Sequence, residues 1–179
     1  MNFAETVFKF YPKEAFKQHL LDPYSFKDAD DVFQEAVARL LSLSGCSVVV
    51  LGKKEYESGV DPKKKRYDVL RTNTGYEHGS VDLIAHHEER DKLCLIDCTT
   101  KVVDEPKIRR LQQTIKELSS EEERSCSRVF GLIPSPRDCS DIKRHYWEDI
   151  HIIDKSDLER ILDLIIEGKV EDARGRFFF

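Results

Sequence analysis

The chain has 179 residues, of which 40% are apolar and 35% charged, and its formal net charge is −5. Such a composition is typical of a soluble globular protein, and the length favours one domain, residues 1–179. A negative charge gives no support to general nucleic-acid binding, no apolar run approaches membrane-spanning length, and the N-terminus lacks the apolar centre of a secretory signal, so we expect a cytoplasmic protein without membrane contact.

The first quarter of the chain predicts two helices and a strand. Residues 12–21 form a short helix, and residues 31–43 form a stronger one, because Asp30 or Asp31 can cap it and its apolar side chains fall on one wide stripe. Residues 47–52, SVVVLG, are rich in β-branched residues and end at glycine, which predicts a buried strand.

Residues 53–80 are the least regular part of the sequence. A short strand over 67–71 is compatible with the pattern, and the remainder is predicted to be a loop. Loops of this length inside a compact domain are often functional or disordered. This loop contains a block of four consecutive basic residues, Lys63, Lys64, Lys65 and Arg66. On charge alone, a solvated surface explains the block best.

A β-hairpin follows the loop. Residues 80–87, SVDLIAHH, and residues 92–100, KLCLIDCTT, both have strand-like patterns, and the charged residues 88–91 turn the chain between them. The next helix is opened by Asp104 and Pro106 and extends to Leu118, with apolar residues on one face.

Two further strands and a helix complete the predicted elements. The strands are residues 127–135 and 149–154, and Ser156 with Glu159 forms a capping box for a helix that ends near Gly168. The chain ends in three phenylalanines, which either dock onto the domain or contact a partner. Helices that alternate with strands in this order predict a three-layer α/β/α domain with a central mixed sheet.

Two aspartates are expected to meet at the end of the hairpin. Side chains alternate along a strand, so Asp97, Thr99 and Lys101 share one face if that strand stays regular. Asp82 on the preceding strand comes near Asp97 when the two strands pair. Two close carboxylates repel each other unless a proton or cation lies between them, and Mg²⁺ is a cation that prefers such oxygen ligands.

Two other readings of these residues stay open. An aspartate at the end of a strand often forms a turn, and Asp97 with Lys101 can make a simple surface ion pair. From the residues alone, these explanations and the metal site are about equally well supported. A second basic group, Lys107, Arg109 and Arg110, is best explained as a solvated helix face.

The cysteines do not predict a disulfide framework, because their number is odd and no CxxC pair occurs. Cys94 and Cys98 lie near His86 and His87, which leaves a zinc site as an alternative, but the spacing matches no standard pattern. We favour small buried apolar side chains for them. The five are Cys46, Cys94, Cys98, Cys126 and Cys139.

The motifs GSVDLIA and LCLIDCTTK, preceded by a helix with FQEAVARLL and the strand SVVVLG, resemble the PD-(D/E)xK superfamily of restriction-endonuclease-like nucleases. The nearest branches are the type IV restriction enzymes and the Holliday-junction resolvases. The likeness covers residues 30–135, with 12–21 and 149–168 as additions, and its motifs are short and degenerate. It implies a restriction-endonuclease-like fold and Mg²⁺- or Mn²⁺-dependent hydrolysis of DNA.

By this resemblance, Asp82 and Asp97 match the two acidic metal ligands, and Glu35 matches a glutamate of the first helix. The spacing of Glu35 to Arg39 also fits a helical ion pair, which we favour slightly. The lysine of the family falls at Thr99 in this chain, so Lys101, two residues later, is expected to supply the ammonium from a shifted position unless the strand has ended there.

Two functions are therefore compatible with the sequence. The first is a metal-dependent DNA endonuclease in restriction, repair or defence, in which the basic block 63–66 contacts DNA phosphates. The second is a degenerate domain of the same fold that binds DNA or protein, which Thr99 favours. The sequence leaves open whether the chain forms a homodimer and whether it belongs to a larger protein.

Overall fold

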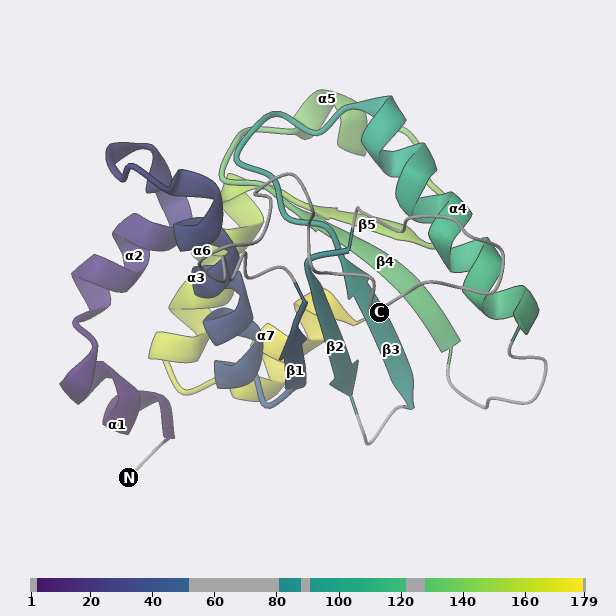
Figure 1. The fold of residues 1–179 in the computed structure, drawn as a ribbon. Helices are drawn as coiled ribbons and strands as arrows, with labels where there is room; N and C mark the ends of the chain where they lie inside the picture. The colour runs from purple at the N-terminus through teal and green to yellow at the C-terminus, as the bar shows by residue number, and fades with distance from the viewer. Residues whose placement is uncertain (1–2, 52–80, 88–90, 122–127, 179) are drawn as a thin grey trace, which may run out of the picture.

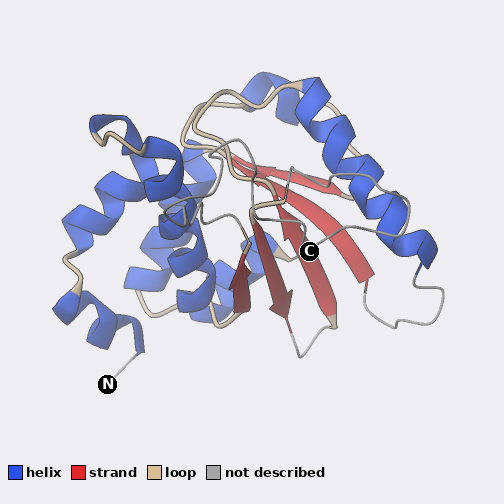
Figure 2. Cartoon of the chain, in the orientation of Figure 1, coloured by secondary structure: helices blue, strands red, loops and turns tan. Residues whose placement is uncertain are grey.

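A five-stranded mixed sheet forms the centre of the protein, and helices lie against both of its faces (Figures 1 and 2). The structure is a computed structural model and describes residues 3–51, 81–87, 91–121 and 128–178. The strands are β1 (Ser47–Val50), β2 (Leu83–His87), β3 (Lys92–Ile96), β4 (Arg128–Pro134) and β5 (Ile150–Ile153), paired in that order. β1, β2 and β3 pair antiparallel, and β3, β4 and β5 pair parallel. The predicted α/β class with a mixed sheet is confirmed.

The helices divide between the two faces of the sheet. They are α1 (Phe3–Phe10), α2 (Lys13–Leu21), the 3-10 helix η1 (Pro23–Ser25), α3 (Ala29–Leu43), α4 (Glu105–Glu121), α5 (Ser140–Lys143), α6 (Lys155–Ile166) and α7 (Val170–Phe177). α4 and α5 lie over one face, and α3, α6 and α7 lie over the other (Figure 2). No helix among the described residues is long and apolar enough to span a membrane.

Strand alternation explains why there are two cores. In β3, Cys94 and Ile96 point into the larger core with α3 and α6, whereas Leu95 points into the smaller core under α4. α4 approaches the sheet closely because β4 has a glycine beneath it. A Cβ at Gly131 would lie 2.8 Å from Cδ2 of Leu111 on α4. The smaller core therefore fixes the position of α4 and of the side chains at its first turn.

Several boundaries differ from the predicted ones. The strand expected over 92–100 ends at Ile96, and the predicted capping box is wrong, because Asp154 caps α6 and pairs with Asp157. The strand SVVVLG is not buried, since β1 is an edge strand whose Val49 is 57% exposed. α1, α5 and α7 were not predicted, and residues 53–80, with their basic block, lie outside the described residues.

The C-terminal phenylalanines dock onto the domain. Phe177 and Phe178 are almost fully buried in the larger core, at the end of α7. The ring of Phe178 contacts those of Phe130 and His87 edge-on, with centroids 5.5 and 5.3 Å apart. Phe177 and Phe178 are therefore part of the core.

We expect Phe177→Ala to lower the free energy of unfolding by about 3–5 kcal/mol, because it removes a fully buried aromatic side chain and leaves a cavity. Urea unfolding followed by circular dichroism measures the change. Phe10→Ala is the control, since this ring is 86% exposed, and its effect should stay within about 0.5 kcal/mol. Equal small losses for both variants would contradict the docked C-terminus.

Candidate functional site

The pairing of β2 with β3 brings Asp82 and Asp97 together. The register pairs Leu83 with Ile96, so the next two residues, Asp82 and Asp97, stand opposite each other where the hairpin strands end. The Asp82 N–H donates to the Ile96 carbonyl across 2.8 Å. Asp97 lies two residues after Leu95, whose side chain packs under α4, and its own carboxylate contacts a side chain of α4. The geometry thus places both predicted acidic residues at one point.

Asp97 is held in a site with little access to water. Its side chain is 5% exposed, and its N–H donates to the Leu132 carbonyl of β4 across 3.1 Å. Oδ1 accepts a hydrogen bond from Nζ of Lys107. Oδ2 is buried and has no hydrogen-bond partner among the described residues. Burial raises the pKa of Asp97, and the ammonium of Lys107 opposes this rise.

Asp82 shares the same environment but has no lysine of its own. Its Oδ2 accepts the N–H of Cys98 across 2.8 Å, and its carbonyl accepts from Nε2 of the buried Gln34 across 3.3 Å. Burial raises its pKa to about 6, and the negative charge of Asp97 adds to this rise. The Cys98 hydrogen bond and the charge of Lys107 offset only part of it. At neutral pH, the pair thus carries a negative charge that the described part of the chain does not fully balance.

Lys107 is the residue that the sequence reasoning missed. It stands in the first turn of α4, where its N–H donates to Oδ1 of the capping Asp104 across 3.0 Å. Its side chain is 17% exposed and reaches Asp97, so it does not belong to a solvated face. The available signal was its spacing, since Lys107 precedes Leu111 by four residues and thus shares the buried face of the helix.

Lys101 and Thr99 do not join the acidic pair. β3 ends at Ile96, so the alternation expected to carry Lys101 to the face of Asp97 is not maintained. The Thr99 N–H donates to the Pro134 carbonyl across 3.1 Å, and Thr99 Oγ1 accepts the Lys101 N–H. The side chain of Lys101 is exposed and makes no ion pair with any described residue. The strand has therefore ended before Lys101. The expectation that Lys101 supplies the ammonium from a shifted position does not hold in this structure.

Glu35 is a surface residue of α3. It pairs with Arg39 across 3.3 Å, and both side chains are more than 40% exposed, as the ion-pair interpretation predicts. From the same helix, Gln34 reaches the carbonyl of Asp82 instead. Asp30, in the first turn of α3, contributes to the raised pKa of Asp82 and accepts a hydrogen bond from Oγ1 of Thr100 across 2.6 Å. The helix thus contributes to the site through Gln34 and Asp30.

The zinc alternative gains no support from the cysteines and histidines. Cys94 is 1% exposed in the larger core, Cys98 packs against the same core, and the ring of His87 contacts Phe178. Cys46 and Cys139 are also buried thiols, and Cys126 lies outside the described residues. The interpretation of these cysteines as small apolar side chains is thus confirmed for the described ones.

The acidic pair itself fits a hard divalent cation. Among the described residues, no group of three or more His, Cys, Asp or Glu side chains is arranged to hold a metal. Mg²⁺ needs fewer protein ligands, because it is usually bound through one or two carboxylates and keeps several waters. The buried, unpartnered Oδ2 of Asp97 and the opposite carboxylate of Asp82 form such a donor set.

We expect Asp82→Asn to stabilise the metal-free protein at pH 7 by about 1–3 kcal/mol, since the folded carboxyl has a pKa of about 6 rather than 3.8. The folded state holds the proton more tightly, so wild-type stability falls as pH rises between these two values. The gain should therefore be largest above pH 6 and vanish near pH 4. Urea unfolding across this range measures it.

The control for this substitution is Asp141→Asn, because that carboxylate is 94% exposed. The difference between its free energy of unfolding and that of the wild type should show no comparable change with pH. A loss of stability in Asp82→Asn at pH 7 would show that the carboxylate of Asp82 is well balanced by its surroundings and would contradict the charge imbalance described above.

Comparison of the chain with protein-family models, with curated proteins and with solved structures found no match. What can be inferred about function therefore comes from Asp82, Asp97 and Lys107 and from the resemblance of the sequence motifs.

Proposed function

We propose that this protein is a metal-dependent DNA endonuclease that hydrolyses phosphodiester bonds with Mg²⁺ or Mn²⁺ held by Asp82 and Asp97. The observation that carries the proposal is the pair of opposed carboxylates, of which Asp97 is buried and Asp82 partly buried. Among the described residues, one lysine contacts the pair and one oxygen has no partner. The restriction-endonuclease-like fold is part of the proposal. It is supported by an antiparallel hairpin that bears the acidic pair and continues into parallel strands.

Each residue would have a distinct role. Asp82 and Asp97 would bind the cation through oxygens that the sheet register and the Cys98 N–H already orient. The cation would stabilise the negative charge that develops on a phosphate under attack. Lys107 would hold the carboxylate of Asp97 ionised and present a second positive charge beside it. Lys107 would thus take the role expected for the lysine that the family has at the position of Thr99.

A second function is favoured by one observation. Oδ1 of Asp97 is already bound by Lys107, and neither Thr99 nor Lys101 offers an ammonium to the pair. A degenerate domain that binds DNA or protein would tolerate such an arrangement. The two functions differ in whether bound DNA is cleaved when a divalent cation is present.

We expect cleavage of plasmid or branched DNA in Mg²⁺ or Mn²⁺, and no cleavage in EDTA. Asp82→Ala and Asp97→Ala should each abolish it, because each removes a ligand oxygen from a set of two. Gel electrophoresis of the DNA products measures the activity. Binding of the same DNA without cleavage under any divalent cation would favour the degenerate domain, and full activity of either variant would exclude this site.

Lys107→Ala should lower the cleavage rate by about 10²-fold or more, as removal of one preorganised positive group does in other enzymes. Its pH–rate profile should also move to higher pH, because Asp97 loses the charge that opposes the rise of its pKa. Lys116→Ala is the matched control, since that lysine is on an exposed position of the same helix. Circular dichroism at the assay temperature verifies that both variants are folded.

A further inference from the structure

Two loops beside the acidic pair are tied together by a buried serine. Ser135 follows β4 and is fully buried. Its Oγ donates to the Lys101 carbonyl across 2.7 Å and accepts the Arg137 N–H across 3.2 Å. The loop after β3, which begins at Asp97, is thereby fixed to the loop after β4. The side chains that these loops carry outward have a defined position relative to the site.

Arg137, in the loop after β4, has a side chain that is held in place by two contacts. Its Cζ lies 3.7 Å from the centre of the Tyr24 ring, on which the guanidinium stacks. Both residues bind one backbone oxygen, the Thr100 carbonyl, across 2.6 Å from Tyr24 Oη and 3.4 Å from Arg137 Nε. Thr100 is three residues from Asp97, so their Cα atoms are within about 11 Å. The guanidinium is thus anchored on the loop that leads away from Asp97.

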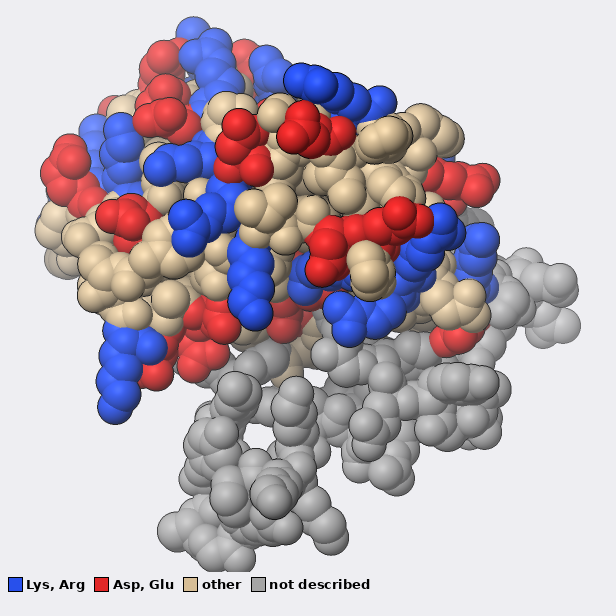
Figure 3. Space-filling view, turned by 90° about the horizontal axis from the view of Figure 1, so that it is seen from above, with Lys and Arg blue, Asp and Glu red and all other residues tan. Residues whose placement is uncertain are grey.

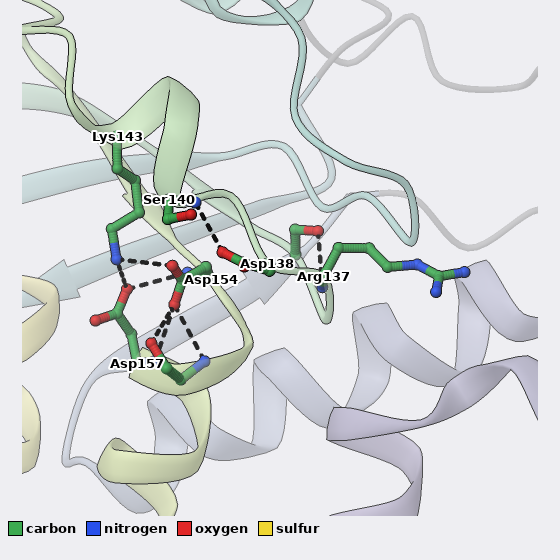
Figure 4. A network of polar contacts seen from close by, with 8 residues as sticks. Arg137, Asp138, Ser140, Lys143, Asp154 and Asp157 are labelled. Atoms are coloured by element: carbon green, nitrogen blue, oxygen red, sulfur yellow. Dashed lines mark hydrogen bonds and ion pairs between the residues drawn. The ribbon is translucent and has the colours of Figure 1, made fainter.

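The terminal NH₂ groups of Arg137 have no anionic partner in the part of the chain that the structure describes. Figure 4 shows the side chain extending away from Lys143, Asp154 and Asp157, which bind one another. Arg137 is exposed and makes no ion pair with any described residue. A guanidinium held on an aromatic ring loses little freedom on binding, and its planar fork of N–H donors can bind two oxygens of one phosphate. The exposed end is therefore preorganised for an anion.

The surroundings argue for a local phosphate contact and against a broad basic surface. In Figure 3, Lys and Arg side chains lie interspersed with Asp and Glu over the face seen from above. Asp22 and Asp30 are close enough to act on Tyr24, although Thr100 already donates to Asp30. One preorganised guanidinium on such a mixed surface suits a partner that carries its negative charge on discrete groups, as the backbone of DNA does along each strand.

We propose that Arg137, stacked on Tyr24, binds a backbone phosphate of DNA next to the one positioned at Asp82 and Asp97. This rests on DNA as the substrate, but not on cleavage. In this assignment the Tyr24 ring fixes the guanidinium, and Ser135 and Thr100 fix its distance from the acidic pair. Arg137 sets the register of the strand along the site and is not a catalytic residue.

The test is the salt dependence of binding to labelled duplex and branched DNA, measured by fluorescence anisotropy in EDTA, where cleavage is blocked. Arg137→Ala should reduce the log–log salt slope by about 0.9, the value for one lost phosphate contact. Arg137→Lys should restore the slope, because it keeps the charge. Arg160→Ala is the matched control, an exposed arginine on α6, and should leave the slope unchanged.

Tyr24→Leu separates orientation from charge. It removes the ring beneath the guanidinium but leaves Arg137 in place, so we expect weaker binding with an intermediate slope. An unchanged slope in Arg137→Ala, or no binding of either DNA by the wild type, would overturn the assignment. Arg137-dependent binding by a wild type that never cleaves would support the contact and overturn the nuclease. Cleavage at equal kcat/KM in wild type and Arg137→Ala would support the nuclease and overturn the Arg137 contact.

Discussion

The register between β2 and β3 places two carboxylates at opposed positions where little water reaches them. Close charges of like sign in such surroundings are unfavourable unless they are protonated or bound to a cation. The neighbouring structure responds to this constraint. Asp104 begins α4 so that Lys107 meets Asp97, and Gly131 lets the helix come close enough for that contact.

A purely structural ion pair does not account for this arrangement. One lysine balances one aspartate, and the Lys107–Asp97 pair would be complete without Asp82. Asp82 makes no ion pair with any described residue, and Arg110 acts on Asp97 through its charge without an ion pair, so the described part of the chain gives Asp82 no direct counter-charge. Residues that destabilise the folded protein in this way are typical of sites that bind a ligand or catalyse a reaction.

The sequence was sufficient for the parts that depend on local pattern. Alternation and turn residues predicted the hairpin, the opposition of Asp82 and Asp97, and the packing of Cys94 and Cys98 into the core. The apolar face of α4 was predicted as well, because its helical period is regular. These features need only the spacing of neighbouring residues along the chain.

Features that depend on tertiary packing could not be predicted in this way. β3 ends at Ile96, the residues after it bind β4 and the loop that follows β4, and no pattern within KLCLIDCTT encodes those partners. The reach of Lys107 depends on Gly131 in another element, and the exposure of β1 depends on its place at the edge of the sheet. In each case a distant segment decides what the local pattern leaves open.

Direct titration of the two carboxyl groups tests the central claim that Asp82 and Asp97 form one unbalanced, cation-accepting pair. Carboxyl ¹³C NMR of the wild type, assigned with Asp82→Asn, gives the pKa of Asp82 with and without Mg²⁺. The structure predicts a pKa of about 6 without the metal. The proposed cation site adds the expectation of a clear fall when Mg²⁺ is added. A pKa close to the ordinary 3.8 that Mg²⁺ leaves unchanged would contradict it.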